Sequence, residues 1–364
     1  MGQNLKLMIP GPVEVDPAVL QAMAGPVQPH YGDIWTTFYH ETIELLKRVI
    51  NTNGDVYLMP GSGTTAIDAC LGSAFATGEK ILVGNNGFFG ERLISIAECY
   101  GLNAIPVKAE WGSVLTPDLF EKAFSEHPDA KGVAIVHLET STTILNPIDQ
   151  IGPLVRGKGA YFFVDAVSSL GGVPFHMDDW CLDFCASATQ KCLGAPPGLA
   201  PCAVGKRGWE AVDRLEFQPH GWFCNLRTWR KYATEWGDWH PTPVTMSSNN
   251  VSALKTGLEQ LMAEGIEVRL TRYKGLALRL REGLRRLGFK LFTPDEIMSP
   301  VLTAAWAPEG IASSKIVSHL AENYHIKIST GLGTLKEKIF RIGTMSPLMT
   351  EQDIDEVLEA LGNF

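Results

Sequence analysis

Short apolar runs alternate with amphipathic stretches along the first half of the chain, and this alternation restricts the folds available to it. The runs at 56–59, 80–83, 133–136 and 161–164 have the length and composition of buried strands. Helical periodicity occupies 64–75, 89–100 and 149–157 between them. Strands that alternate with helices are typical of a mostly parallel, doubly wound sheet. The sequence therefore predicts the α/β class.

The pattern changes after about residue 265. A long, arginine-rich amphipathic helix is predicted over 266–287. An apolar strand at 300–306, a helix at 313–324, a strand at 338–342 and a final helix at 351–361 follow it. This order indicates a separate α+β unit. We expect an N-terminal arm over residues 1–20, a large domain over 21–264 and a small C-terminal domain over 265–364.

The composition limits which binding partners and which cellular location we expect for the protein. The net charge of −9 argues against a nucleic-acid or anionic-membrane partner. We find no apolar run long enough to cross a bilayer and no signal-peptide pattern, so we expect a cytoplasmic protein. Seven cysteines without CxxC spacing indicate free thiols in a reducing compartment.

Metal binding is not expected. Nine histidines form no HxxxH or HxH group. Cys181 and Cys185 would share a face if they lay on a helix, and could then bind a metal, but buried small hydrophobic residues are the favoured interpretation.

Three segments carry residues suited to chemistry. Gly61-Ser-Gly-Thr-Thr-Ala66 follows a strand and opens a helix, which suits a phosphate group but also suits an ordinary turn. Asp165 ends a buried strand, where it would either cap the next helix or face a ligand. Lys191 lies before the turn Gly194-Ala-Pro-Pro-Gly198, and a desolvated lysine there becomes an amine nucleophile, whereas a solvated one is inert.

The combination is more specific than any one segment. A phosphate cradle, a strand-end acid and a lysine one strand later provide the three contacts that pyridoxal 5'-phosphate (PLP) needs. The phosphate requires donors, the pyridinium nitrogen an anion and the aldehyde an amine. We therefore expect PLP as the cofactor.

From Pro10-Gly-Pro12 to Arg341-Ile-Gly343, the chain resembles the class V aminotransferases of fold type I. It looks most similar to the alanine–glyoxylate and serine–glyoxylate branch. The resemblance implies a large domain with a mostly parallel seven-stranded sheet. It also implies a homodimer in which each active site takes contacts from the neighbouring chain.

The resemblance assigns roles to individual residues. It implies that Lys191 carries the cofactor and that Asp165 holds the ring nitrogen. Phe89, where many relatives have tryptophan, would stack on the ring, and Arg341 would bind the substrate carboxylate. The remaining cofactor contacts would be Ser62, Gly63, Thr64, Thr140, Val167, Gln190 and, from the partner chain, Thr242. The remaining substrate contacts would be Gly11 and Tyr31, the latter on a loop that in this family reaches the neighbouring subunit's site, although a surface turn is an equal alternative.

The implied activity is transamination between a small neutral amino acid, alanine or serine, and glyoxylate or pyruvate. Small neutral donors are favoured because no second arginine falls at a position that we can assign to a side-chain carboxylate. Pyridoxamine–pyruvate and 2-aminoethylphosphonate–pyruvate exchange are alternatives, although the intact phosphate loop argues against the first. A non-catalytic regulator that kept the fold would be expected to lose Lys191, Asp165 or Arg341, and all three are present.

A tryptophan-rich stretch from Trp222 to Trp239 shows little regular period. Such a stretch is typical of a protein core or of a subunit interface. The uncertain match of Thr242 falls directly after it.

Overall fold

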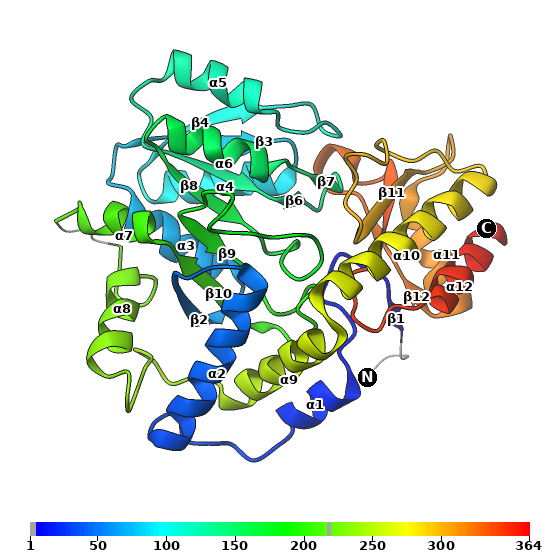
Figure 1. The fold of residues 1–364 in the computed structure, drawn as a ribbon. Coiled ribbons are helices and arrows are strands. Elements are labelled where there is room, and N and C mark those ends of the chain that lie inside the picture. The colour runs from blue at the N-terminus through cyan, green and yellow to red at the C-terminus, as the bar shows by residue number, and fades with distance from the viewer. Residues whose placement is uncertain (1–4, 217–219) are drawn as a thin grey trace.

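The computed structural model describes residues 5–216 and 220–364, so that residues 1–4 of the expected N-terminal arm lie outside the described residues. Figure 1 shows a large body around one sheet and a smaller body, coloured orange to red, beside it. The helices are α1 (Pro17–Met23), α2 (Asp33–Ile50), α3 (Gly63–Ala74), α4 (Phe88–Cys99), α5 (Pro117–Glu126), α6 (Ile148–Gly157), α7 (Lys206–Asp213), α8 (Leu226–Glu235), α9 (Ser248–Glu264), α10 (Ile266–Arg286), α11 (Ser313–Tyr324) and α12 (Glu351–Gly362), with a 3-10 turn at Gly333–Leu335.

Seven strands form the main sheet, in the order β2-β10-β9-β8-β5-β3-β4. Only β10 runs against its neighbours; the other pairs are parallel. Fold class and strand number therefore agree with the prediction. The strands are β2 (Asp55–Gly61), β3 (Lys80–Asn85), β4 (Asn103–Lys108), β5 (Gly132–Val136), β8 (Tyr161–Asp165), β9 (Phe184–Ala186) and β10 (Gly198–Val204), with a separate hairpin of β6 (Leu138–Glu139) and β7 (Ile144–Leu145).

The direction of the crossovers sets where the helices lie. The connections from β2 to β3 and from β3 to β4 run one way along the sheet, and those from β4 to β5 and from β5 to β8 run back. Because such crossovers are right-handed, α3 and α4 cover one face and α5 and α6 the other. Ligands bind at the carboxyl ends of the strands where the direction reverses, next to β3 and β5.

Strand burial explains why the apolar runs were predictive. Every residue of β5 is buried, and so are the last four residues of β8. A strand covered on both faces has no polar side, so it reads as a continuous apolar run rather than an alternating one. The predicted helices over 64–75, 89–100 and 149–157 agree with α3, α4 and α6 to within one residue at each end.

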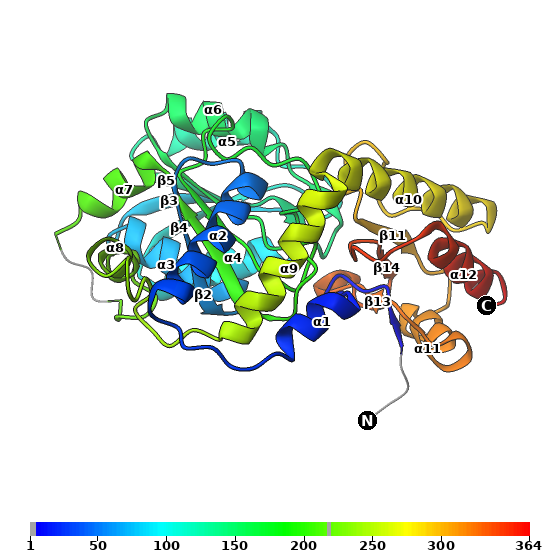
Figure 2. The same cartoon turned by 60° about the horizontal axis from the view of Figure 1, so that its bottom comes forward.

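The smaller body surrounds a three-stranded sheet in the order β11-β14-β13. Helices α10, α11 and α12 pack on it around a second hydrophobic cluster that includes Leu280, Ile316, Phe340 and Val357. Figure 2 shows α9 leading into α10, where the chain passes from one body to the other at Gly265. The N-terminal strand joins this body as well, because β1 pairs with β12. The strands are β1 (Lys6–Leu7), β11 (Leu302–Trp306), β12 (Ile326–Lys327), β13 (Ser329–Thr330) and β14 (Ile339–Gly343).

Two sequence interpretations need correction. The tryptophan-rich stretch contains the regular helix α8, in which Trp229 is fully buried, whereas Trp222, Trp236 and Trp239 are about half exposed. Cys181 and Cys185 do not share a helix, because Cys185 lies in β9 and Cys181 in the preceding turn. No helix in the part of the chain that the structure describes is long and apolar enough to span a membrane.

Candidate active site

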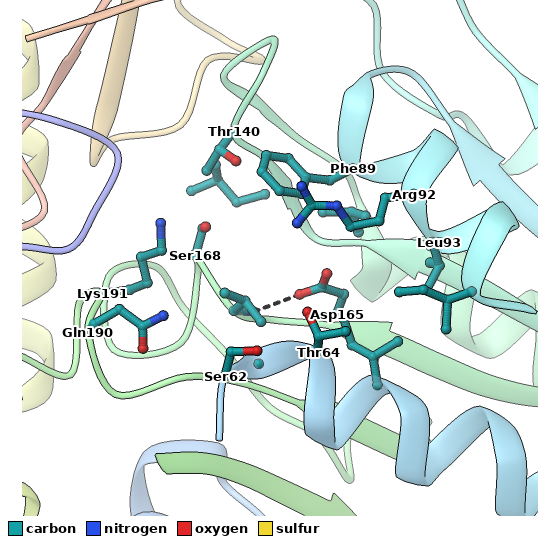
Figure 3. A pocket seen from close by; sticks show the side chains of 16 residues that line it. Ser62, Thr64, Phe89, Arg92, Leu93, Thr140, Asp165, Ser168, Gln190 and Lys191 are labelled. Carbon is teal, nitrogen blue, oxygen red and sulfur yellow. Dashed lines mark hydrogen bonds between the residues drawn. The ribbon is translucent and has the colours of Figure 1, made fainter. Parts of the chain in front are cut away.

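A cavity of about 310 Å³ opens at the carboxyl ends of the central strands. It brings together nine of the residues singled out in the sequence, from five separate segments (Figure 3). Lys191 and Gln190 lie on one side of it, and Phe89 lies on the other. The predicted residues that line it are Ser62, Gly63, Thr64, Phe89, Thr140, Asp165, Val167, Gln190 and Lys191, the last two being neighbours in one turn.

The loop between β2 and α3 suits an anion. Ser62 is the N-cap residue of α3, yet its side chain makes no capping hydrogen bond. The hydroxyl groups of Ser62 and Thr64 border the cavity beside the first turn of the helix, where backbone N–H groups and the helix dipole favour negative charge. A Cβ at Gly63 would come within 2.4 Å of Val167 Cγ2, so glycine lets the two segments pack closely.

Asp165 occupies the last position of β8 and is 7% exposed. Its Oδ1 accepts a hydrogen bond of 2.9 Å from the backbone N–H of Val167 (Figure 3), which holds the carboxylate at the strand end. Burial raises the pKa of Asp165 to about 6, against the opposing effect of that hydrogen bond. The environment therefore favours pairing this carboxylate with a nearby proton donor.

Lys191 follows β9 in a tight turn, with most of its side chain buried. Burial lowers the pKa of its amine to about 8, and the nearby positive charge of Arg341 acts in the same direction. Its Nζ donates a hydrogen bond to the carbonyl of Pro10. Gly11 lies against the same side chain, since a Cβ there would come within 2.5 Å of Lys191 Cδ. The N-terminal arm thus closes one side of the lysine.

Arg341 reaches the site from the smaller body. It lies in the middle of β14, and its Nη1 donates to the carbonyl of Thr140 at 2.6 Å and its Nε to that of Thr330 at 2.9 Å. Burial lowers the pKa of Arg341 to about 10, while the charge of Glu139 acts to raise it. Arg341 does not itself line the cavity, but it contacts Thr140, which does.

Arg92 is a charged residue of the cavity lining to which the sequence assigned no role. It lies one helical turn after Phe89 on α4, with its guanidinium carbon 4.8 Å from the centre of the Phe89 ring. Arg92 is thus a second arginine near the site, and whether it binds a side-chain carboxylate is tested by the choice of amino donor. The signal was available: residues three positions apart on a helix share a face.

Tyr31 and Thr242 do not reach the cavity within one chain. Tyr31 is 49% exposed, and its ring lies 5.6 Å from that of Trp239. Thr242 is fully buried, and its hydroxyl donates to the carbonyl of Val244 at 3.0 Å. In this arrangement the Thr242 hydroxyl is already engaged, so its expected role toward a partner chain would require a local rearrangement.

The class V aminotransferase family matches residues 19–357 of the chain. A relative from Methanocaldococcus jannaschii, described as an uncharacterised aminotransferase, is 40% identical over 339 residues, which cover 93% of this chain and 87% of the relative. The chain belongs to the class V aminotransferases.

Solved structures agree with the assignment of this chain to the class V aminotransferases. An alanine–glyoxylate aminotransferase from a Nostoc species matches with a TM-score of 0.95 and 30% identity, over 100% of this chain and 96% of that one. A ureidoglycine–glyoxylate aminotransferase from Bacillus subtilis matches with a TM-score of 0.93 and 32% identity, over 100% of this chain and 93% of that one. The fold is thus that of the fold type I PLP enzymes.

The aminotransferases of this fold use PLP, and the residues present fit that cofactor. The helix start at Ser62 and Thr64 supplies donors for a phosphate. Gln190 also lines the cavity, and its side-chain NH₂ group is a further possible donor. Asp165 supplies an anion for the ring nitrogen, and Lys191 supplies a buried amine with a lowered pKa.

Proposed function

We propose that the enzyme transfers an amino group from a small neutral amino acid, alanine or serine, to glyoxylate or pyruvate. The observation that carries this proposal is the meeting of Lys191, Asp165 and the Ser62–Thr64 helix start in one cavity, with Arg341 alongside. Arg341, beside Thr140, is suited to bind the α-carboxylate that all amino donors share. Its planar guanidinium group can donate two parallel hydrogen bonds to the two oxygens of a carboxylate.

The proposed roles follow from the environments. Bound PLP supplies an aldehyde for the amino group and a ring that withdraws electrons from the substrate Cα. The Lys191 amine holds the cofactor between turnovers and moves the proton at Cα, for which a pKa near 8 is well matched. Asp165 holds the proton on the ring nitrogen. Ser62, Gly63, Thr64 and Gln190 bind the phosphate.

The ring contacts and the substrate end complete the proposal. Phe89 and Val167 would hold the pyridine ring, and Thr140 would contact its hydroxyl group. Arg341 would bind the α-carboxylate, and the backbone at Gly11, which lies against Lys191, would also contact the substrate. The division into an arm at 1–20, a large domain at 21–264 and a small domain at 265–364 is supported by the two separate hydrophobic clusters and by the change of helix at Gly265.

We propose further that the protein is a cytoplasmic homodimer. The support is an exposed aromatic surface formed by Tyr31, Trp222, Trp236 and Trp239, each about half exposed. Rigid aromatic side chains are enriched in protein interfaces. The Tyr31 and Thr242 contributions to a neighbouring site belong to this proposal.

A panel of amino donors tests the activity. Alanine, serine, aspartate, 2-aminoethylphosphonate and pyridoxamine are each assayed with glyoxylate and with pyruvate. We expect alanine or serine to give the highest kcat/KM. A preference for aspartate would instead indicate that Arg92 reads a second carboxylate, and a preference for 2-aminoethylphosphonate or pyridoxamine would favour those alternative activities. No turnover with any pair would overturn the proposal.

A further inference from the structure

The proposed roles leave one buried acid beside the cavity unused. Glu139 lies at the end of the short strand β6, and none of its surface is exposed. Its Oε1 accepts hydrogen bonds from the backbone N–H of Ser141 at 3.0 Å and from the Ser141 hydroxyl at 2.5 Å. Its Oε2 accepts from the backbone N–H groups of Phe89 at 3.0 Å and Gly90 at 2.9 Å. Four donors therefore converge on one carboxylate.

This set of partners matches an ionised carboxylate. The Ser141 oxygen accepts from the Phe88 N–H at 2.9 Å, which leaves its own hydrogen to point at Glu139. All four contacts are thus donors, and an ionised carboxylate only accepts. Burial raises the pKa of Glu139, and the hydrogen bonds from Ser141, Gly90 and Phe89 oppose that shift. The N-terminus of α4 adds a favourable dipole.

The network joins two segments that each contribute a residue to the cavity lining, Phe89 from one and Thr140 from the other. One end is the first turn of α4, which carries Phe89 and, one turn later, Arg92. The other end is the segment containing Thr140, whose carbonyl accepts from Arg341. A Cβ at Gly87 would lie 2.4 Å from Glu139 Cγ, so the backbone before α4 is packed directly against this side chain.

We propose that Glu139 is a positioning residue that fixes the start of α4 against the Thr140 segment, and so sets the placement of Phe89 relative to Arg341. The inference rests on the proposed roles of these two residues. Glu139 touches neither substrate nor cofactor in this account. Its contribution is to keep Phe89, which would stack on the cofactor ring, at a fixed position relative to Arg341, which would bind the substrate carboxylate.

The test compares Glu139→Gln with Glu91→Gln. The first keeps the size of the side chain but turns one acceptor oxygen into an NH₂ group, which must face donors. The second removes an exposed acid from the first turn of the same helix, so it controls for the loss of helix-dipole charge. Both proteins are purified with PLP. We measure the PLP dissociation constant by equilibrium dialysis and the visible circular dichroism per bound PLP.

We expect Glu139→Gln to weaken PLP binding about tenfold or more, the scale for losing a buried hydrogen bond to a charged group, and to change the circular dichroism of the bound cofactor. Glu91→Gln should match the wild type in both. A Glu139→Gln protein with a lower melting temperature but unchanged PLP affinity and circular dichroism would show a purely structural role and overturn the inference. Wild-type protein that binds no PLP would instead overturn the proposed function.

Ser141→Ala provides a milder second variant if Glu139→Gln does not fold. It removes one donor to Glu139 and the acceptor for the Phe88 N–H, and leaves the carboxylate in place. We expect a smaller change in the same two measurements. Wild-type values for PLP affinity and circular dichroism in this variant would count against the inference.

Discussion

The cavity and the aromatic surface differ in how far one chain can complete them. In the cavity, Asp165 is buried and Lys191 is mostly buried, and their contacts come from strand ends and turns of the same chain. On the aromatic surface, Tyr31 and Trp239 pack on one another but remain about half exposed. The difference fits the proposed homodimer, in which most of the site lies within one chain and the aromatic surface forms the interface that brings in the partner's contributions.

Replacing Lys191 by alanine should have the largest effect on activity. It removes the catalytic amine from the cavity and leaves the aromatic surface unchanged. We expect kcat/KM to fall about 10³-fold or more, since both the cofactor-carrying amine and the proton carrier are lost. Sedimentation should still give the wild-type oligomer. Residual transamination within about tenfold of the wild type would show that another group moves the proton.

Asp165→Asn should have the next largest effect. A neutral amide cannot hold the ring proton as a carboxylate does, so we expect about a 100-fold slower single turnover, the scale for losing an electrostatic partner in a buried site. The amide can still accept from the Val167 N–H, so the melting temperature should change little. A rate within a few-fold of the wild type would reduce Asp165 to a strand-end cap.

Arg341→Lys should act on substrate binding rather than on the cofactor. Lysine keeps the charge but lacks the planar fork, so we expect the KM for alanine to rise about tenfold or more. PLP affinity, measured by dialysis, should stay near the wild-type value. An unchanged KM would place the carboxylate site elsewhere in the cavity.

Trp239→Ala tests the other side of the comparison. If the aromatic surface is an interface, loss of this ring should weaken self-association about 30-fold, as for an aromatic hot spot of about 2 kcal/mol. Leu278→Ala, an exposed apolar residue on α10, is the matched control. Sedimentation equilibrium measures both. Equal association constants for the two variants would show that the aromatic surface is not an interface and only packs on the core of its own chain.

A smaller effect comes from the charge on Lys191 itself. Because burial lowers its pKa from 10.5 to about 8, the buried ammonium destabilises the cofactor-free fold below pH 8, and this penalty fades as pH rises toward 10.5. Lys191→Met should therefore stabilise the cofactor-free protein by up to about 3 kcal/mol more at pH 7 than at pH 10. Denaturant unfolding at the two pH values measures the difference. An equal gain at both would mean that the amine is solvated.

The sequence predicted the parts of the site that depend on local pattern. Asp165 and Lys191 stand out because buried parallel strands read as apolar runs, and polar residues at their ends are conspicuous. Arg92 was within reach, since it lies one helical turn from Phe89. A closer reading of helical spacing would have found it.

Other features depend on contacts between distant segments. Glu139 is buried because N–H groups about 50 residues earlier in the chain converge on it, and no local pattern shows this. The helix α8 was not predicted because the tryptophans in and beside it face different surroundings: Trp229 is in the core, and Trp236, the C-cap residue, is about half exposed.

The most direct test of the central claim asks which residue carries the cofactor. The purified protein with bound PLP is reduced with borohydride, digested, and examined by peptide mass spectrometry, with Lys191→Ala as the control. We predict that the reduced cofactor is attached to Lys191 and that the variant carries none. Attachment to any other lysine of the wild-type protein would contradict the account.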